Sequence, residues 1–363
     1  MFDCHKEITD FHKQEVTLKK SQQDEMRNRR DANRKRLHDG LSKSGKPLPI
    51  RHVAQGSYAM HTMVQDKDND YDIDDGAVFK KADLVGDRGA EMSALDARKM
   101  VRDALDDGSF EKPPEVRNNC VRVYYKAGYH VDIPVYRELE DSTLELASSE
   151  WNGSSPTEVT DWYQNSVTKK SPDNNNGQQM RRITRLIKAF MRSRDSWKCS
   201  MPSGLELSVL IDERYTSDCN REDVALYETM KCIRDRLIYD LEIKHPVRNE
   251  MLTDGPDDAN TRFLREILEE ALDNLEILFE PDCTRLDALK AWNKVLKHKY
   301  WEDLIAEEKK KQNNKEKGEA AAILRGGNTG LSIASGVTAA FIAAKAFAEP
   351  IKTTRSYGGK VDW

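Results

Sequence analysis

The sequence lacks the cysteine spacing of a zinc ribbon. No two cysteines form a Cys-x-x-Cys pair, and none has a histidine at the spacing of a zinc site. Structural zinc sites take their ligands from such closely spaced pairs, so this class of site is excluded. Scattered thiols, together with an opening that has no apolar signal core, predict a reducing, cytoplasmic location. The cysteines are Cys4, Cys120, Cys199, Cys219, Cys232 and Cys283.

The sequence also lacks a clear membrane span. Its one candidate, residues 331–348, is short, rich in Ala and interrupted by Lys345. A spanning helix needs about 20 predominantly apolar residues. We therefore expect an amphipathic or packed tail in this segment, with no stable membrane insertion.

The sequence has no excess of positive charge either. The 363 residues carry a net charge of -5, with 33% charged and 38% hydrophobic residues. This balance excludes a protein that coats nucleic acid, so an anionic partner must meet a local basic surface. The hydrophobic content is enough for the core of two domains or of one large bilobal domain.

One local basic surface is a run within a predicted helix. Residues 15–40 have helical composition and predict a helix that ends at Gly40. Residues 27–36, "RNRRDANRKR", form the basic run. We expect a solvated helix face here, and an anion-binding ridge is the alternative.

The remaining pattern predicts a β-rich half followed by a helical half. Strands are predicted in "YDIDDGAVF" (71–79) and as two strands around a turn at Ala127-Gly128 within residues 121–137, with a helix over 90–107 between them. Residues 169–179 form a polar loop. From residue 180 onward, apolar residues recur with helical period. The predicted fold class is α+β.

A Gly-Ser pair is followed by a predicted strand that carries an unusual number of carboxylates. The stretch "QGSYAMHTMVQDKDNDYDIDDGAVF" (55–79) contains Asp70, Asp72, Asp74 and Asp75. Side chains at i and i+2 of a strand share a face. Asp72 satisfies this rule with Asp74 and equally with Asp70, so spacing alone leaves both pairs open.

Paired carboxylates on a strand repel unless a cation neutralises them. Mg²⁺ prefers such oxygen ligands, and two ions can serve nucleotidyl transfer. In "YHVDIPVY", Asp132 lies opposite an apolar face and would complete three carboxylates. It is also suited to orient or deprotonate a ribose hydroxyl. The alternative, a turn and an exposed edge, is the one we favour for Asp70 and Asp75.

The Gly56-Ser57 pair has little specificity alone, because a tight turn is its usual explanation. Its position upstream of an Asp-x-Asp strand gives it weight. Gly allows close backbone approach, free N–H groups there can bind an anion, and Ser57 adds a hydroxyl donor for a triphosphate.

Together these motifs resemble the polymerase β-like nucleotidyltransferase superfamily. "QGSYAMHTMVQ…YDIDDGAVF", "HVDIPVY" and "RLIKAFMRSRDSW…PSGL" are similar to the cGAS/DncV-like nucleotidyltransferases, and most to their bacterial cyclic GMP-AMP synthase branch. The resemblance implies a bilobal chain: a nucleotidyltransferase core lobe with an N-terminal helix (1–165), a helical lobe that closes the nucleotide cleft (166–318), and a flexible C-terminal tail (319–363).

The resemblance also implies roles for particular residues. It selects Asp72 and Asp74 as ligands of two Mg²⁺ or Mn²⁺ ions, adds Asp132 as the third acid, and places the donor triphosphate on Gly56 and Ser57.

Three further residues match family positions but have ordinary alternatives. Lys188 matches a helix lysine that contacts the donor phosphates, although surface lysines commonly lie at helix flanks. Ser203 matches a serine near the same phosphates, and it also begins a capping box with Glu206. Arg122 lies near a position that contacts a nucleobase.

The implied activity is synthesis of a cyclic dinucleotide, such as cyclic GMP-AMP, from ATP and GTP, with a role in antiphage signalling through a downstream effector protein. The absent zinc ribbon gives no expectation of activation by double-stranded DNA. Gly358-Gly359 near the end of the sequence leaves a conjugating or regulatory partner open. The alternatives are a cyclic trinucleotide, nucleotide addition to RNA or protein, and a nucleotide sensor without catalysis.

Overall fold

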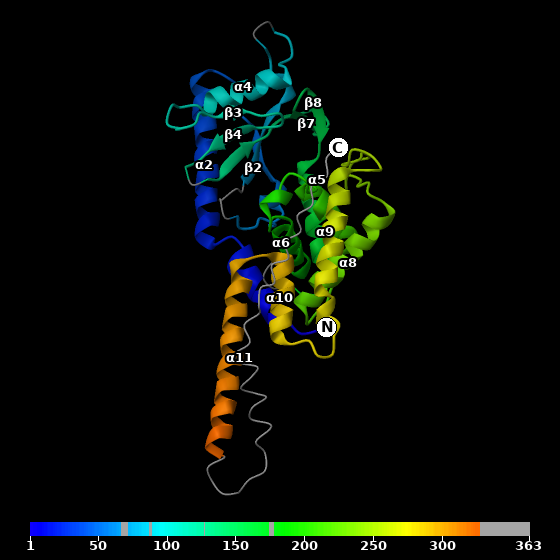
Figure 1. The fold of residues 1–363 in the computed structure, drawn as a ribbon. Helices are drawn as coiled ribbons and strands as arrows, with labels where there is room; N and C mark the ends of the chain where they lie inside the picture. Colours follow the sequence, from blue (N-terminus) through cyan, green and yellow to red (C-terminus); the bar gives the residue numbers. More distant parts are fainter. Residues whose placement is uncertain (67–71, 87–88, 127, 174–177, 327–363) are drawn as a thin grey trace, which may run out of the picture. The chain divides into compact units, whose positions relative to one another are not determined.

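The computed structural model describes residues 1–66, 72–86, 89–126, 128–173 and 178–326 (Figure 1). Within these residues the strands form one eight-stranded sheet, ordered β3-β4-β5-β2-β6-β7-β8, with β1 also paired to β2. The strands are β1 (Arg51–Gln55), β2 (Asp72–Lys80), β3 (Glu115–Val116), β4 (Val121–Tyr124), β5 (His130–Ile133), β6 (Val135–Glu138), β7 (Leu144–Ala147) and β8 (Trp151–Ser154).

The helices lie before, within and after the strands in the sequence. They are α1 (His5–Phe11), α2 (Lys20–Lys43), α3 (Gly56–Ala59), α4 (Ala94–Leu105), α5 (Pro156–Lys170), α6 (Gln179–Met191), α7 (Gly204–Arg214), α8 (Glu222–Tyr239), α9 (Ala259–Leu275), α10 (Arg285–Leu296) and α11 (Lys299–Gly326). Short helical turns cover His12–Val16, Lys81–Asp83, Asp195–Trp197 and Glu276–Phe279. The architecture confirms the predicted α+β class.

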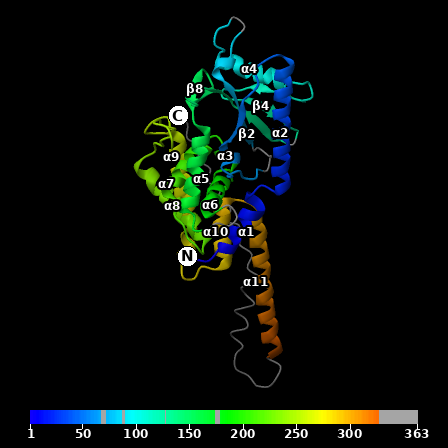
Figure 2. The same cartoon turned by 180° about the vertical axis from the view of Figure 1, so that it is seen from behind.

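Two apolar cores are built from different parts of the chain. In one, Leu37 and Leu41 of α2 and Val101 of α4 pack with buried strand residues. In the other, buried residues of helices α5 to α10 pack together with those of α1 and with Met60 and Val64 (Figure 2). The predicted apolar stripe of α6, from Ile183 to Met191, is buried in this helical core. So is the start of the chain, including Cys4 and Ile8.

Strand β2 is the central element for the site. It runs parallel to β5 and β6 and antiparallel to β1. The offset between β2 and β5 continues unchanged into β6, so residues 130–138 act as one strand that Pro134 interrupts. Proline has no backbone N–H to donate, which explains the break in the second of the two strands predicted for 121–137.

The prediction that a helix ends at Gly40 was wrong, because α2 continues to Lys43. Gly40 instead lies where α2 crosses α4. A Cβ atom at this position would come within 2.0 Å of the Ala104 carbonyl oxygen, so only glycine fits this contact.

The expectation that Asp75 is an exposed edge residue was also wrong. Its side chain is buried, and the guanidinium of Arg34 donates to its two oxygens at 2.7 and 2.5 Å. One arginine of the basic run is therefore a structural anchor between α2 and β2, and the run is not simply a solvated face. Asp70 lies outside the described residues.

The end of the chain is described only in part. Residues 309–326 continue α11, and the rest of the predicted tail lies outside the described residues. Among the helices that the structure describes, none has the length and apolar character to cross a bilayer. The segment 331–348 lies outside the described residues. The predicted lobe boundaries stay predictions.

Candidate active site

Two neighbouring strands place four polar side chains on one face of the sheet. In the parallel register of β2 and β5, Asp72 lies beside His130 and Asp74 beside Asp132. Residues two apart on a strand share a face, so the four side chains form the corners of a rectangle. The structure therefore brings together the three acids that the sequence singled out, and it adds a histidine.

The negative charges of this group are compensated unequally. Burial, followed by the carboxylates of Asp72 and Asp132, raises the pKa of Asp74 well above its usual range. Burial alone would also raise the pKa of Asp72, but His130 and nearby arginines bring it below its usual value. Asp74 is thus the acid with the strongest need for a cation.

Asp132 is held by Arg122 from the adjacent strand. The two residues face each other across the β4–β5 pair. Nε and Nη2 of Arg122 donate to the two oxygens of Asp132 at 2.8 and 2.7 Å, a bidentate ion pair. The guanidinium thus faces an acid and not the cavity described below, and a nucleobase contact of Arg122 stays a prediction.

Arg122→Ala is expected to lower the free energy of unfolding by about 2 kcal/mol, because two charge-assisted hydrogen bonds are lost while Asp132 stays buried. Urea unfolding measures this change. The unfolding free energy of Arg122→Lys should lie between those of the wild type and of Arg122→Ala, because a lysine keeps the charge but cannot make the bidentate pair. If Arg122 served only a nucleobase, the alanine variant would raise KM and unfold like the wild type.

The Gly-Ser pair begins the one-turn helix α3 directly after β1. Gln55, the last residue of β1, pairs with Asp74 of β2. Gly56 has a positive φ of 62°, which favours glycine. A Cβ atom there would lie 2.2 Å from Oδ2 of Asp74. Glycine is therefore required both by the backbone conformation and by the approach of an acid, and it places Ser57 next to the acids.

Lys188 and Ser203 come from the helical core. Lys188 projects from α6, and its Nζ donates to the Thr62 hydroxyl at 3.0 Å. Burial, and then the nearby Arg192, lowers the pKa of Lys188 to about 7. Ser203 caps α7, with its hydroxyl accepting from the Glu206 N–H at 3.3 Å. The Glu206 carboxylate accepts from the Ser203 N–H, so the predicted capping box is confirmed.

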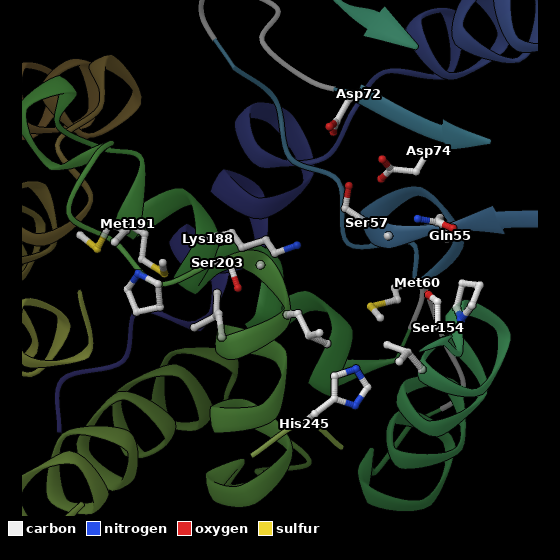
Figure 3. Close-up of a pocket in the computed structure, with 18 of the residues that line it drawn as sticks. Gln55, Ser57, Met60, Asp72, Asp74, Ser154, Lys188, Met191, Ser203 and His245 are labelled. Carbon is white, nitrogen blue, oxygen red and sulfur yellow. The ribbon is translucent and has the colours of Figure 1, made fainter. Parts of the chain in front are cut away.

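A cavity of about 680 Å³ joins these groups. In Figure 3, Asp72, Asp74 and Ser57 lie together on one side, and the Lys188 ammonium points toward them from the other. Ser203 lies beside Lys188. Asp132 and Arg122 are not among the residues that line the cavity. The other six predicted residues do line it: Gly56, Ser57, Asp72, Asp74, Lys188 and Ser203.

The donor set fits a divalent cation. One ligand atom each from Asp72, His130 and Asp132 lies within 4.8 Å of the others. This spread is close to the roughly 4.2 Å that opposite ligands span around an ion with bonds of about 2.1 Å. The raised pKa of Asp74 also shows where additional positive charge would be stabilising. The residues present could therefore hold Mg²⁺ or Mn²⁺.

Sequence reasoning missed two contributions to the site. His130 had a signal, because it stands two residues before Asp132 on the same strand and so shares its face. His245 and Arg248 had none. They reach the cavity from the segment between α8 and α9, where Arg248 donates to the Gly153 carbonyl of β8 at 2.5 Å.

Comparison with known proteins finds a related domain in the segment that builds this site. Residues 50–136 match the sequence model of the nucleotidyltransferase domain of cyclic GMP-AMP synthase DncV-like proteins. The matched segment contains β1, α3 and β2 and ends within β6, and so includes Gly56, Ser57 and the four corner residues.

Solved structures show the same fold over most of the chain. The Vibrio cholerae DncV cyclic AMP-GMP synthase, in complex with the linear intermediate 5' pppA(3',5')pG, has 17% identity and a TM-score of 0.63, with 82% of this chain and 96% of that chain covered. The Bradyrhizobium diazoefficiens CD-NTase CdnG, in complex with GTP, has 14% identity and a TM-score of 0.63, covering 81% and 97%.

A third structure, Escherichia coli CdnC with ATP, has 18% identity and a TM-score of 0.59, covering 82% of this chain and 98% of that chain. Likeness at these identities describes the fold, while the sequence match describes the nucleotidyltransferase domain. Residues 50–136 thus match the nucleotidyltransferase domain of DncV-like proteins, and the chain shares the fold of these solved structures.

Proposed function

We propose that this protein is a metal-dependent cyclic oligonucleotide synthase. It joins nucleoside triphosphates and closes the product into a ring, with release of pyrophosphate. One observation carries the proposal: the DncV-like domain presents Asp72, Asp74 and Ser57 to one cavity, opposite Lys188 of the helical core. Acids for cations and donors for phosphate thus face each other across a space for nucleotides.

In this proposal Gly56 and Ser57 hold the donor triphosphate by backbone N–H groups and a hydroxyl. Lys188 and the capped start of α7 at Ser203 contact the same phosphates from the other side. Asp72, Asp74 and Asp132 would hold two divalent ions. When bound, such ions stabilise charge on the attacking and leaving oxygens.

The chain's own residues then position the reaction. Asp132, fixed by Arg122, orients the attacking ribose hydroxyl and accepts its proton. The hydroxyl oxygen forms a bond to the α-phosphorus of the donor, and the bond from that phosphorus to the β-phosphate oxygen breaks. Pyrophosphate leaves, and a second round of the same step closes the ring.

For substrates we propose ATP together with GTP, and for the product a cyclic dinucleotide such as cyclic GMP-AMP. The support is the linear adenine–guanine intermediate bound in the Vibrio cholerae relative, and the GTP and ATP complexes of the other two. A cyclic trinucleotide is the alternative product, and RNA or protein are the alternative acceptors. The proposed cellular role is antiphage signalling of the CBASS type, through an effector that binds the product.

The test is incubation of the full chain with all four ribonucleoside triphosphates and Mg²⁺ or Mn²⁺, followed by phosphatase treatment and mass spectrometry. The expected result is a phosphatase-resistant small product that contains adenine. Labelled nucleotide on RNA or protein would show a different transferase. Tight ATP binding without turnover under any divalent ion would show a sensor.

Nucleotide binding is expected to weaken as the pH rises through 7. Lys188, whose pKa is lowered to about 7, is charged below this value and neutral above it. If the charged form is the competent one, the apparent affinity for an ATP analogue should fall roughly tenfold between pH 6 and pH 8. Isothermal titration at several pH values measures this.

Lys188→Met should bind the ATP analogue weakly, with an affinity that does not change with pH. Lys188→Arg should bind it with an affinity that stays constant between pH 6 and pH 8, because arginine does not lose its proton in this range. A wild-type affinity that is independent of pH would contradict a phosphate contact by Lys188.

A further inference from the structure

Within the part of the chain that the structure describes, His130 is a buried polar residue of the site whose Nε2 has no hydrogen-bond partner. Its side chain is 8% exposed, and among the described residues no atom forms a hydrogen bond with its Nε2. The nearest oxygens of Asp72 and Asp132 lie 3.7 and 4.0 Å away, too far for hydrogen bonds. A buried nitrogen without a partner costs free energy, so its position requires an explanation.

The strand register explains why the imidazole lies between two acids. His130 is beside Asp72 in the β2–β5 pair and two residues before Asp132 on its own strand. Tyr124 of β4 flanks it on the other side, with ring centroids 6.3 Å apart. Ligand atoms from the histidine and both acids converge within 4.8 Å. This convergence is the arrangement of a ligand, because an imidazole nitrogen with no other partner binds transition-metal ions well.

We propose that His130 is a nitrogen ligand of the metal centre, and that the centre therefore favours Mn²⁺ over Mg²⁺. The proposal rests on the proposed function for the identity of the centre. Mg²⁺ takes hard oxygen ligands, whereas imidazole suits transition metals. Mn²⁺ accepts both carboxylate and imidazole. Replacing one oxygen donor by nitrogen thus shifts the preference of the site without removing its acids.

The remaining ligands tolerate this assignment. Asp132 accepts two hydrogen bonds from Arg122, which leaves lone pairs free on both oxygens. Asp72 lies beside His130 in the strand register, with its carboxylate oxygen among the converging ligand atoms. Asp74 lies beside Asp132 and can share an ion with it.

The experiment is Mn²⁺ titration of the full chain without nucleotide, followed by electron paramagnetic resonance. Loss of the free Mn²⁺ signal gives the affinity, competition with Mg²⁺ gives the preference, and pulsed measurements detect a directly bound imidazole nitrogen. The variants are His130→Gln and His130→Asn. His38→Gln is the matched control, because it removes an exposed imidazole of α2 that does not line the cavity.

The wild type should bind Mn²⁺ with a nitrogen coupling. Both His130 variants should lose the coupling and at least about tenfold in Mn²⁺ affinity, since even outer-shell changes cost this much. Mg²⁺ affinity should change less, and His38→Gln should bind Mn²⁺ as the wild type does. The metal-free variants should melt at or above the wild-type temperature, which excludes a purely structural role.

Absence of the nitrogen coupling in the wild type, or equal Mn²⁺ affinity in wild type and His130 variants, would overturn the proposal. So would a wild type that binds no Mn²⁺. The proposed function is judged separately by product formation with Mg²⁺. Product formation without a nitrogen coupling would support the proposed function and contradict His130 as a ligand. A nitrogen coupling without product would support His130 as a ligand and contradict the proposed function.

Discussion

Asp74→Asn is expected to reduce turnover by at least about 1,000-fold, because bound metal stabilises transition-state charge by several kcal/mol and each 1.36 kcal/mol is tenfold in rate. The side chain is the least compensated acid of the site, and Asn cannot supply the negative charge that holds a cation. Pyrophosphate release and mass spectrometry of the product measure the loss.

The same substitution is expected to stabilise the metal-free protein at neutral pH. Folding raises the pKa of Asp74, so the stability that this group contributes is present below its unfolded pKa of about 4 and is lost as the pH rises through the folded pKa. Asn has no charge to bury. The melting temperature of the variant should therefore exceed that of the wild type by an amount that grows from acidic to neutral pH.

An Asp74→Asn protein that is more stable but inactive would identify Asp74 as a metal ligand, because loss of a structural residue would lower the stability. Asp103→Asn is a suitable control, since this acid lies at the surface of α4 beside Arg102 and should affect neither quantity. An Asp74→Asn enzyme that keeps a tenth or more of the wild-type turnover would refute the metal assignment.

Gly56→Ala is expected to lose both stability and activity. The backbone conformation costs an L-residue about 1 kcal/mol or more. In addition, the new Cβ would meet Oδ2 of Asp74 at 2.2 Å, so either the acid or α3 must move. A shift of about 1 Å in a catalytic group can cost 100-fold in rate. We expect a loss of at least this size, measured as initial rate, together with a lower melting temperature.

The chain offers a control that separates the two causes. Gly45 has nearly the same φ, 63°, with open space around it, so Gly45→Ala reports backbone strain alone. It should destabilise the protein by about 1 kcal/mol and leave turnover unchanged. Combining Gly56→Ala with Asp74→Ala should remove the excess destabilisation. If the two substitutions simply add, the contact with Asp74 is not the cause.

Much of the site followed from local rules in the sequence. The two-residue period of a strand grouped the acids, and the helical period located α6 with its lysine. Resemblance chose Asp72 and Asp74 over the other pair. These features are predictable because they depend on neighbours along the chain, or on motifs that short segments carry whole.

What could not be predicted depends on contacts between distant segments. Asp75 is buried because Arg34, forty-one residues earlier, reaches it from α2. Gly40 continues a helix because α4 packs against it. Arg122 faces Asp132 through a strand register that no spacing specifies. The orphan nitrogen of His130 was hidden for the same reason, although its shared face with Asp132 was visible.

The buried start of the chain has a mechanical consequence. Residues 1–16 pack in the helical core, and so do Met60 and Val64, which lie between β1 and β2 in the sequence, whereas α2 and the strands build the other core. The chain therefore crosses between the two cores at several points, and not only where β8 leads into α5. Each crossing ties one core to the other, so a large movement between them would have to pull the segment around Met60 out of its packing. Ser154 and Pro156, at the last crossing, line the cavity.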